Sequence, residues 1–419
     1  MIRPSYFYNL LIKNGTDFFA GVPDSLLKNF CAYITDTAPA EKHIISANEG
    51  SATALACGYH FATGKIPLIY MQNSGEGNMV NPMLSIADKD VYSVPMLIVI
   101  GWRGEPGVHD EPQHVKQGKV TCDLLDAMKI PYEILSENED DLPAQFEKAY
   151  KYIKDNNAQY AFVIRKGTFD EYKLQNNIPV EGKMSREEAI EKIILNADSS
   201  TAFVSTTGMA SRELYELRDK YNQGHEKDFL TVGGMGHASQ IALSIAMQKK
   251  DRQIYCIDGD GASIMQMGGM ATIGSRKPSN YVHFVLNNGA HDSVGGQPTV
   301  GRQIDLCAIA KGCGYENVVK VETPEELEAV LRDYETKDKL TFVEVMVTKG
   351  ARKDLGRPKS TPVENKEALE ESVKQSVIEA KPNNVDSIEI KQNPAYELKL
   401  VDRTQETNED EIANKIEEN

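Results

Sequence analysis

The chain has 419 residues, of which 41% are hydrophobic and 26% charged, and its formal net charge is −16 at pH 7. This length is sufficient for two or three domains, each with its own core. The negative charge argues against nucleic acid or an anionic membrane surface as the main partner. An anionic substrate can still bind where a pocket is locally positive or rich in backbone N–H groups.

The cysteines and the N-terminal segment indicate the cellular compartment in which the protein is located. The six cysteines form no CxxC pair, which is typical of reduced cysteines in a cytosolic protein. The first ten residues, MIRPSYFYNL, lack an apolar signal core. No apolar run of the sequence reaches the roughly 18 residues of a membrane span. We therefore expect a soluble, cytoplasmic protein.

Short apolar runs alternate with helical patterns over residues 1–168. The expected strands are 18–22, 43–46, 67–72, 95–100, 132–135 and 160–165. Helical patterns between them cover 24–35, 50–63 and 117–128. This alternation predicts an α/β domain with a mostly parallel sheet and helices on both faces.

The same alternation returns after an interruption. Residues 169–184 lose the periodicity, so we expect a linker there. Expected strands of a second domain, 185–350, are 202–205, 229–232, 254–257, 281–286 and 342–347. The predicted fold class is therefore α/β, with two doubly wound parallel-sheet domains and no middle domain. Residues 351–419 are expected to form an acidic, polar C-terminal extension with one amphipathic helix over 359–377.

The stretch GDGASIMQMGGMATIGSRKPSNYVHFVLNN runs from Gly259 to Asn288. Asp260 follows one expected strand and Asn288 follows the next, and ligands of a parallel sheet bind at such strand ends. Gly259 and Gly261 allow close approach of the backbone to a phosphate, and a helix starting near Ala262 directs its free N–H groups toward that anion. Carboxylate and amide oxygens suit Mg²⁺. The segment thus predicts a magnesium–diphosphate site.

A second motif lies in the first domain. The stretch ANEGSATALACGYHFATGK, residues 47–65, places Glu49 directly after the strand expected at 43–46. By itself, a glutamate at the start of a helix is most often an ordinary N-terminal carboxylate. If it is buried enough to keep a proton, it can instead act as a catalytic acid or base.

Together the two motifs resemble those of the thiamine-diphosphate enzymes. GDG and NN, separated by 25 residues, resemble the cofactor signature of that family, and the segment around Glu49 resembles its activating-glutamate motif. The resemblance implies thiamine diphosphate and Mg²⁺ as cofactors, with Asp260, Asn288 and the carbonyl of Ala290 as metal ligands. It also implies that Glu49 contacts the aminopyrimidine ring and so promotes proton removal from the thiazolium. Two coincidental βα turns are the alternative explanation of GDG and NN.

Further cofactor contacts are expected in both domains. The stretch TVGGMGHASQIALSIA, residues 231–246, combines a strand, a glycine turn and a helix of small residues. By the same resemblance, Met235 supports the bent conformation of the cofactor, whereas a core methionine is the alternative. The dinucleotide motif G-x-G-x-x-G is not met, because Ser239 stands in place of its third glycine. Asn73 and Gly208 complete the expected cofactor contacts.

Four further stretches narrow the resemblance: GVPDSLL (21–27), QNSGEGNMVNP (72–82), GWRGEPGVHDEPQH (101–114) and LNNGAHDSVGGQPT (286–299). They resemble the two-domain decarboxylases of phosphonopyruvate and, next, those of sulfopyruvate, which often divide the two domains between separate chains. The resemblance implies decarboxylation of 3-phosphonopyruvate to phosphonoacetaldehyde and CO₂ through an enamine on the cofactor. Sulfopyruvate decarboxylation, carboligation and a regulatory subunit that binds the cofactor without turnover remain alternatives.

The resemblance also implies an assembly. In the family the cofactor lies between the first domain of one subunit and the second domain of its partner. We therefore expect a homodimer or higher homo-oligomer in which Glu49 and Asp260 meet across a subunit boundary, with no nucleic acid or membrane partner.

Loops at strand ends supply candidates for substrate binding: Asp24, Ser25, Arg103, His291 and Ser293. Hydroxyl and guanidinium groups of this kind bind anions. A helix cap is equally consistent with Asp24 and Ser25, and a surface arginine is the alternative for Arg103.

Histidines in a Gly/Pro-rich loop are candidates for proton transfer. His109 and His114 belong to the stretch 101–114, and imidazole titrates near neutral pH. We expect them to act as a catalytic proton relay, although either one could instead only fix the loop.

Overall fold

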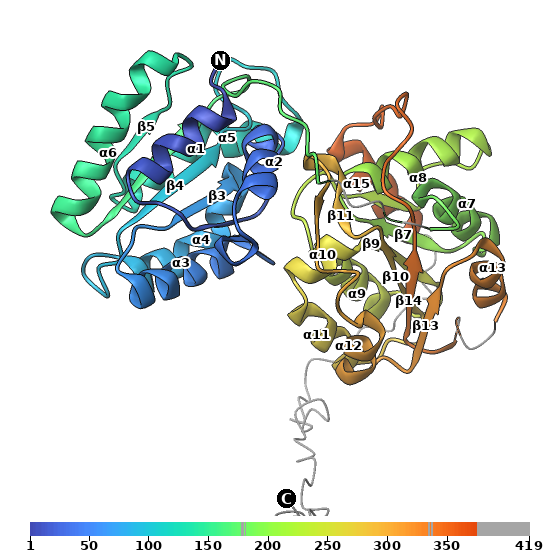
Figure 1. Ribbon diagram of the computed structural model, residues 1–419. Coiled ribbons are helices and arrows are strands. Elements are labelled where there is room, and N and C mark those ends of the chain that lie inside the picture. The colour runs from blue at the N-terminus through green and yellow to red at the C-terminus, as the bar shows by residue number, and fades with distance from the viewer. Residues whose placement is uncertain (177–179, 181, 334–335, 337, 375–419) are drawn as a thin grey trace, which may run out of the picture. The chain divides into compact units, whose positions relative to one another are not determined.

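The computed structural model describes residues 1–176, 180, 182–333, 336 and 338–374 (Figure 1). These residues form two α/β domains, each built on a six-stranded sheet. Every pairing within the two sheets is parallel. The predicted α/β fold class with two parallel-sheet domains is confirmed. The linker expected at 169–184 includes 177–179 and 181, which lie outside the described residues.

The first domain has the strand order β2-β1-β3-β4-β6-β5. Its strands are β1 (Phe19–Gly21), β2 (His43–Ile45), β3 (Leu68–Gln72), β4 (Met96–Gly101), β5 (Tyr132–Ile134) and β6 (Gln159–Ile164). Its helices are α1 (Pro4–Lys13), α2 (Lys28–Thr37), α3 (Glu49–Thr63), α4 (Glu76–Pro82), α5 (Pro112–Ala127) and α6 (Leu142–Asn156). Helices α1, α2 and α6 pack on one face of the sheet, and α3 and α5 pack on the other.

The second domain has the strand order β13-β14-β10-β9-β7-β8. Its strands are β7 (Ala202–Ser205), β8 (Asp228–Leu230), β9 (Ile254–Gly259), β10 (Tyr281–Asn287), β13 (Asn317–Val321) and β14 (Thr341–Met346). Its helices include α7 (Arg186–Asn196), α8 (Met209–Lys220), α9 (Ala238–Gln248), α10 (Asp260–Met265), α11 (Gly268–Arg276), α12 (Leu306–Cys313), α13 (Pro324–Arg332) and α15 (Pro362–Lys374). A small antiparallel pair, β11 (Ala290–His291) and β12 (Gln297–Pro298), follows β10.

The two sheets share one topology. When the strands of each domain are numbered in chain order, both sheets read 2-1-3-4-6-5. In each sheet the first and third strands are neighbours. The first strand is followed by the second on one side of this pair, and the third strand is followed by the fourth on the other side. A crevice forms at the carboxyl ends of two such strands, and ligands of open α/β sheets bind there. The topology therefore sets one candidate crevice after β1 and β3 and another after β7 and β9.

The strands are buried on both faces, as a parallel sheet covered by helices requires. In β4, Leu97 and Val99 join the core under α1, α2 and α6, whereas Ile98 and Ile100 join the core under α3 and α5. All four side chains are fully buried. This explains why the strands read as continuous apolar runs in the sequence.

Two expected elements differ from the structure at their boundaries. The helix predicted at 24–35 begins only at Lys28, because the Asp24 carboxylate accepts from the N–H groups of Leu26 and Leu27 in the preceding turn. Strand β13 was missed. It is an edge strand whose residues are mostly only half-buried, so it lacks the apolar run that marks the inner strands.

A helix within the expected C-terminal extension belongs to the second domain. Asn365 of α15 is buried, and its side chain bonds to two backbone groups of β8. It accepts from the N–H of Leu230 at 3.0 Å and donates to the C=O of Asp228 at 2.8 Å. Because β8 is the edge strand of its sheet, α15 covers this edge and provides hydrogen-bond partners for two of its backbone groups. Helix α15 thus packs on the second domain although it lies beyond the boundary expected at 350, and residues 375–419 lie outside the described residues.

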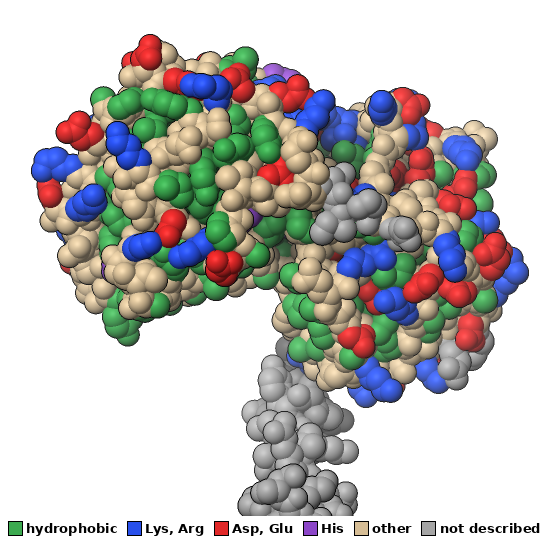
Figure 2. Space-filling model, in the orientation of Figure 1, with side chains coloured by type: hydrophobic (Ala, Val, Ile, Leu, Met, Phe, Trp, Pro, Cys, Tyr) green, Lys and Arg blue, Asp and Glu red, His purple; other side chains and the backbone are tan. Residues whose placement is uncertain are grey.

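The surface in view mixes positive and negative side chains (Figure 2). The acidic side chains drawn on this face are thus not gathered into one block. Among the described helices, none has the length and apolar character that a membrane span requires.

We predict that Asn365→Ala lowers the free energy of unfolding by about 1–3 kcal/mol, because it leaves two buried backbone groups of β8 without partners. The shift of the urea midpoint measures this effect. The matched control is Glu367→Ala on the exposed side of the same helix, for which we expect a change within about 0.5 kcal/mol. Equal midpoints for the two variants would contradict the role of α15 at this edge.

Candidate active site

A cavity of about 550 Å³ is lined by residues of both α/β domains. This volume falls within the range of about 300–1,000 Å³ that is usual for ligand sites. The predicted site residues that line it are Ser25, Glu49, Arg103, His114, Gly208, Met235, Gly259, Asp260, Gly261, Ala262, Asn288, Ala290, His291 and Ser293. Asp24, Asn73 and His109 are not among the lining residues.

Glu49 is the first residue of α3 and is 4% exposed. The helix begins here because the side chain of Asn48 accepts from the N–H of Ser51 at 2.9 Å, which caps the first turn. The Glu49 carboxylate accepts from the side chain of Asn78 at 2.7 Å. A Cβ atom at Gly75 would lie 2.5 Å from the carboxyl carbon of Glu49, so a larger residue there would displace the Glu49 side chain from this position. The carboxyl group is thus held in one position at the cavity wall.

Asp260 is the first residue of α10 and is 2% exposed. Burial raises the pKa of Asp260 to about 6, and a hydrogen bond from the Thr299 hydroxyl opposes this rise. Strands β9 and β10 pair with Leu286 opposite Gly259. This register places Asp260 and Asn288 at the same edge of the sheet.

The Asn288 side chain has a fixed orientation. Its amide nitrogen donates to Asp292 at 2.7 Å, and its oxygen accepts from the N–H of Ala290 at 3.0 Å. The same oxygen of Asp292 also accepts from the N–H of Gly350 at 2.9 Å. Since an amide bonded through its nitrogen cannot flip without losing that bond, the amide oxygen of Asn288 keeps its direction.

Asp292 is in turn held by a buried ion pair. Arg186, the first residue of α7, donates to Asp292 at 3.0 Å and to both carboxylate oxygens of Glu213 at 2.8 and 2.9 Å. Glu213 and Arg186 are both buried. Sequence reasoning missed these three residues, because their pairing joins segments more than 20 residues apart and leaves no local pattern.

Met235 and His291 both lie close to Gly261. A Cβ atom at Gly261 would lie 3.3 Å from the terminal methyl carbon of Met235 and 3.1 Å from a ring carbon of His291. Met235 stands between Gly234 and Gly236, whose φ values of +67° and +86° suit glycine. Burial lowers the pKa of His291 to about 4, so its imidazole is neutral at pH 7.

Arg103, which follows β4, is held in place by its neighbours. Its guanidinium donates to Asp110 at 2.7 Å and to the Ser25 hydroxyl at 2.8 Å. Asn73 fixes the backbone of Arg103, donating to its C=O at 2.8 Å and accepting from its N–H at 3.2 Å. Asn73 therefore positions the loop from behind, and its side chain is not part of the cavity wall.

Two further predicted residues also lie away from the cavity. Asp24 is fully buried and accepts from the N–H of Leu26 and from the side chain of Gln72 at 2.6 Å, so it stabilises the turn before α2, whose N-cap residue is Leu27. His109 is exposed in the loop before α5. His114, on α5, is buried and lines the cavity. Its pKa is lowered by burial and by the nearby charge of Arg103.

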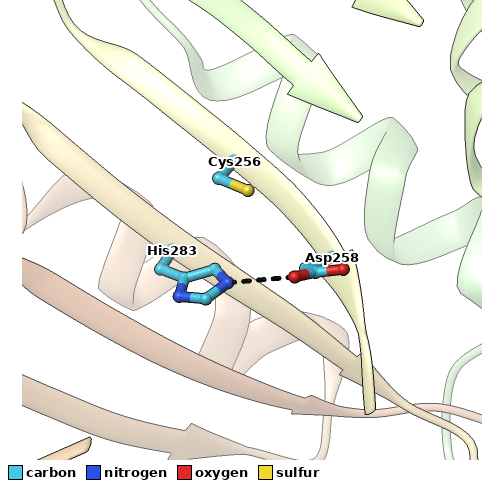
Figure 3. Close-up of side chains that lie close together, drawn as sticks. All are labelled: Cys256, Asp258 and His283. Carbon is cyan, nitrogen blue, oxygen red and sulfur yellow. Dashed lines mark hydrogen bonds and ion pairs between the residues drawn. The ribbon is translucent and has the colours of Figure 1, made fainter. Parts of the chain in front are cut away.

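Three side chains of kinds that can bind metal ions lie close together near the GDG turn (Figure 3). Cys256 and Asp258 on β9 and His283 on β10 are all buried, with their ligand atoms within 4.8 Å of one another. Protein groups already bond to the Asp258 carboxylate: the N–H of Gly259 at 2.9 Å, the Ser263 hydroxyl at 3.3 Å and His283 at 3.5 Å. Asp258 thus links the end of β9 to α10 and supports the turn that carries Asp260.

Two family descriptions match the chain. "Thiamine pyrophosphate enzyme, N-terminal TPP binding domain" covers residues 5–128, and "Thiamine pyrophosphate enzyme, C-terminal TPP binding domain" covers residues 206–345. The first match falls in the domain that carries Glu49, and the second falls in the domain that carries Asp260.

Similar proteins include two decarboxylases. Phosphonopyruvate decarboxylase of Streptomyces viridochromogenes is 33% identical over 371 residues, which are 84% of this chain and 89% of that protein. Sulfopyruvate decarboxylase of Methanosarcina acetivorans is 26% identical over 81% of this chain and 90% of that protein. Among solved structures, the thiamine diphosphate-dependent 4-hydroxybenzoylformate decarboxylase of Rhodococcus jostii RHA1 is 13% identical with a TM-score of 0.35, over 83% of this chain and 99% of that chain. The chain belongs to the thiamine pyrophosphate enzymes, in the family that holds the phosphonopyruvate decarboxylases.

Proposed function

We propose that this chain decarboxylates 3-phosphonopyruvate to phosphonoacetaldehyde and CO₂, with thiamine diphosphate and Mg²⁺ as cofactors. The observation that carries the proposal is that Glu49 and Asp260, each buried at the start of a helix, line one cavity. The similarity to phosphonopyruvate decarboxylases over most of both chains supports the choice of substrate. Sulfopyruvate is the alternative substrate, since a sulfopyruvate decarboxylase is also similar at lower identity.

The residues present fit both cofactors. The carboxylate of Asp260, the amide oxygen of Asn288 and the backbone carbonyl of Ala290 are hard oxygen donors, which Mg²⁺ prefers. A Cβ atom at Gly259 would meet no atom within 4 Å, so the backbone of this turn is open to the cavity that it lines. Glu49, fixed by Asn78, is available to a heterocycle at the cavity wall.

The cofactor supplies an electron sink next to the carboxylate that leaves as CO₂. The chain itself orients and protects the reacting groups. The carboxyl group of Glu49, fixed by Asn78, would contact the pyrimidine ring, and Asn288 keeps its oxygen directed by its bond to Asp292. Met235, whose side chain lies beside Gly261, would support the cofactor from its turn. The neutral imidazole of His114 can donate from one ring nitrogen and accept at the other, so it remains our candidate for proton transfer.

One prediction of the proposed function concerns the substrate. We expect CO₂ release from phosphonopyruvate with thiamine diphosphate and Mg²⁺, and formation of phosphonoacetaldehyde in ³¹P NMR spectra. A second anionic group bound by charge-assisted hydrogen bonds should make kcat/KM for phosphonopyruvate about 10- to 100-fold higher than for pyruvate. A higher kcat/KM for sulfopyruvate would instead favour the alternative, and no turnover of any 2-oxo acid would contradict the proposal.

Another prediction of the proposed function concerns Glu49. Glu49→Gln should lower kcat by about 10²- to 10⁴-fold, the usual contribution of a general acid–base group, and should change the affinity for thiamine diphosphate only modestly. The matched control is Glu76→Gln. Glu76 is a buried glutamate at the start of α4 that does not line the cavity. Unchanged turnover in Glu49→Gln would exclude the catalytic role and favour a subunit that only binds the cofactor.

The exposed face of α3 supports the expected homodimer. Leu55 and Phe61 on this helix are 36% and 60% exposed, and Tyr92, whose ring centroid lies 6.3 Å from that of Phe61, is 66% exposed. Adjoining apolar side chains of this kind are typical of protein contact surfaces. We propose that a second copy of the chain covers this face, and that in the dimer the same residues build each cavity, with Glu49 contributed by one subunit and Asp260 by the other. The six unpaired cysteines support a cytoplasmic location.

Complementation tests the shared site. Glu49→Gln and Asp260→Ala chains should each be inactive alone. After subunit exchange, about a quarter of wild-type activity should return, because half of the dimers are mixed and each has one intact site. Native mass spectrometry verifies the exchange. If mixed dimers form and no activity returns, both residues of a site come from one chain, as they line one cavity in the structure described here.

A further inference from the structure

Four guanidinium groups line the cavity, and three of them are bound to carboxylates. Arg103 donates to Asp110, Arg186 donates to Glu213 and Asp292, and Arg357 donates to Glu111 at 2.9 Å. The fourth, Arg212, makes no hydrogen bond or ion pair with any residue in the described part of the chain. Arg212 is therefore the positive charge of this cavity that the protein itself does not neutralise.

Arg212 is half-buried in the first turns of α8, four residues after Gly208. Burial and the neighbouring charge of Arg357 lower the pKa of Arg212, while Glu111 opposes this shift. A guanidinium keeps its proton at neutral pH even so. Since Glu111 is bonded to Arg357, the group of two arginines and one glutamate retains an excess positive charge.

The start of α8 adds to this excess. Gly208, Met209 and Ala210 line the cavity together with Arg212. The N-cap residue Gly208 provides no side chain to cap the helix. The partial positive charge of a helix N-terminus then acts in the same direction as the guanidinium. An anion in this part of the cavity would therefore be stabilised by Arg212 and by the start of α8.

The two anionic ends of a 3-phosphonopyruvate molecule differ in what the reaction does to them. The carboxylate loses its charge as CO₂ leaves, so a strong ion pair with it would stabilise the substrate more than the transition state. The phosphonate keeps its charge throughout. A fixed guanidinium therefore serves best at the phosphonate, where it contributes to binding without opposing the chemical step.

We propose that Arg212 binds the phosphonate group of the substrate and thereby determines the preference for 2-oxo acids with a second, tetrahedral anionic group. This inference rests on the proposed function. It assigns the phosphonate to the second domain, at the start of α8, whereas the sequence-based candidates Ser25 and Arg103 belong to the first. Arg103 is already bound to Asp110 and to the Ser25 hydroxyl.

The test compares the wild type with Arg212→Gln, Arg212→Lys and the control Arg276→Gln, which removes an exposed arginine outside the cavity. For phosphonopyruvate, Arg212→Gln should raise KM about 10- to 100-fold, the loss expected for charge-assisted hydrogen bonds, with a much smaller change in kcat. KM for pyruvate should stay within about twofold. Arg212→Lys should restore part of the affinity, because it keeps the charge but not the bidentate geometry.

A binding measurement keeps the result independent of turnover. The non-reactive analogue 3-phosphonopropanoate, titrated calorimetrically into the enzyme with thiamine diphosphate and Mg²⁺, should bind Arg212→Gln about 10- to 100-fold more weakly than the wild type. If KM for phosphonopyruvate and the affinity for the analogue are both unchanged in Arg212→Gln, the inference is wrong. An equal rise of KM for pyruvate also contradicts it, since the effect would not depend on the phosphonate. A wild type without activity on phosphonopyruvate would instead overturn the proposed function.

Discussion

The parallel pairing of β9 with β10 is the constraint on which the candidate site depends. With Leu286 opposite Gly259, the two strands end together, and the residues that follow them share one edge of the sheet. A shift by one residue would turn Asp260 or Asn288 to the other face. The buried Asp258 strengthens this arrangement, since it bonds to Gly259 and to Ser263 of α10. The position of the proposed metal ligands therefore follows from backbone register and from one supporting carboxylate.

Shared topology does not give the two domains shared chemistry. Both sheets have the same strand order, and each offers a crevice after its first and third strands. The second domain places Asp260 after its third strand, β9, whereas Glu49 of the first domain follows the second strand, β2. The fold provides the crevices, and the side chains at particular strand ends decide which chemistry each crevice supports.

The net charge of −16 does not predict which ligands the cavity binds. The carboxylates in and around the cavity mostly bond to other protein groups and orient them. Asp110, Asp292 and Glu111 each bind an arginine, which leaves Arg212 as the group open to an anion.

The sequence predicted those features that depend on local pattern. Inner strands such as β4 are continuous apolar runs, and GDG and NN each follow one directly, so the fold class and the placement of Asp260 could be read from the sequence. Edge strand β13 lacks such a run and was missed. Asp24 and Asn73 were expected to contact ligands, but neither lines the cavity; Asp24 bonds to the backbone of its own turn, and Asn73 bonds to the backbone of Arg103. Arg212 and Asp292 were not recognised, because what distinguishes them is the presence or lack of partners far along the chain.

Glu49 and Glu76 illustrate why burial and composition alone could not have identified the acidic group of the site. Both are buried glutamates at the first position of a helix that begins near a strand end. Burial raises the pKa of Glu76 to about 8, so it is uncharged at neutral pH, and one of its oxygens has no hydrogen-bond partner among the described residues. A pKa shifted this far by burial is often taken as a sign of a functional residue. Glu76 nevertheless lies outside the cavity wall, whereas Glu49 is fixed by Asn78 and faces the cavity. Access to a ligand, and not the degree of burial, therefore separates the candidate catalytic acid from its neighbour.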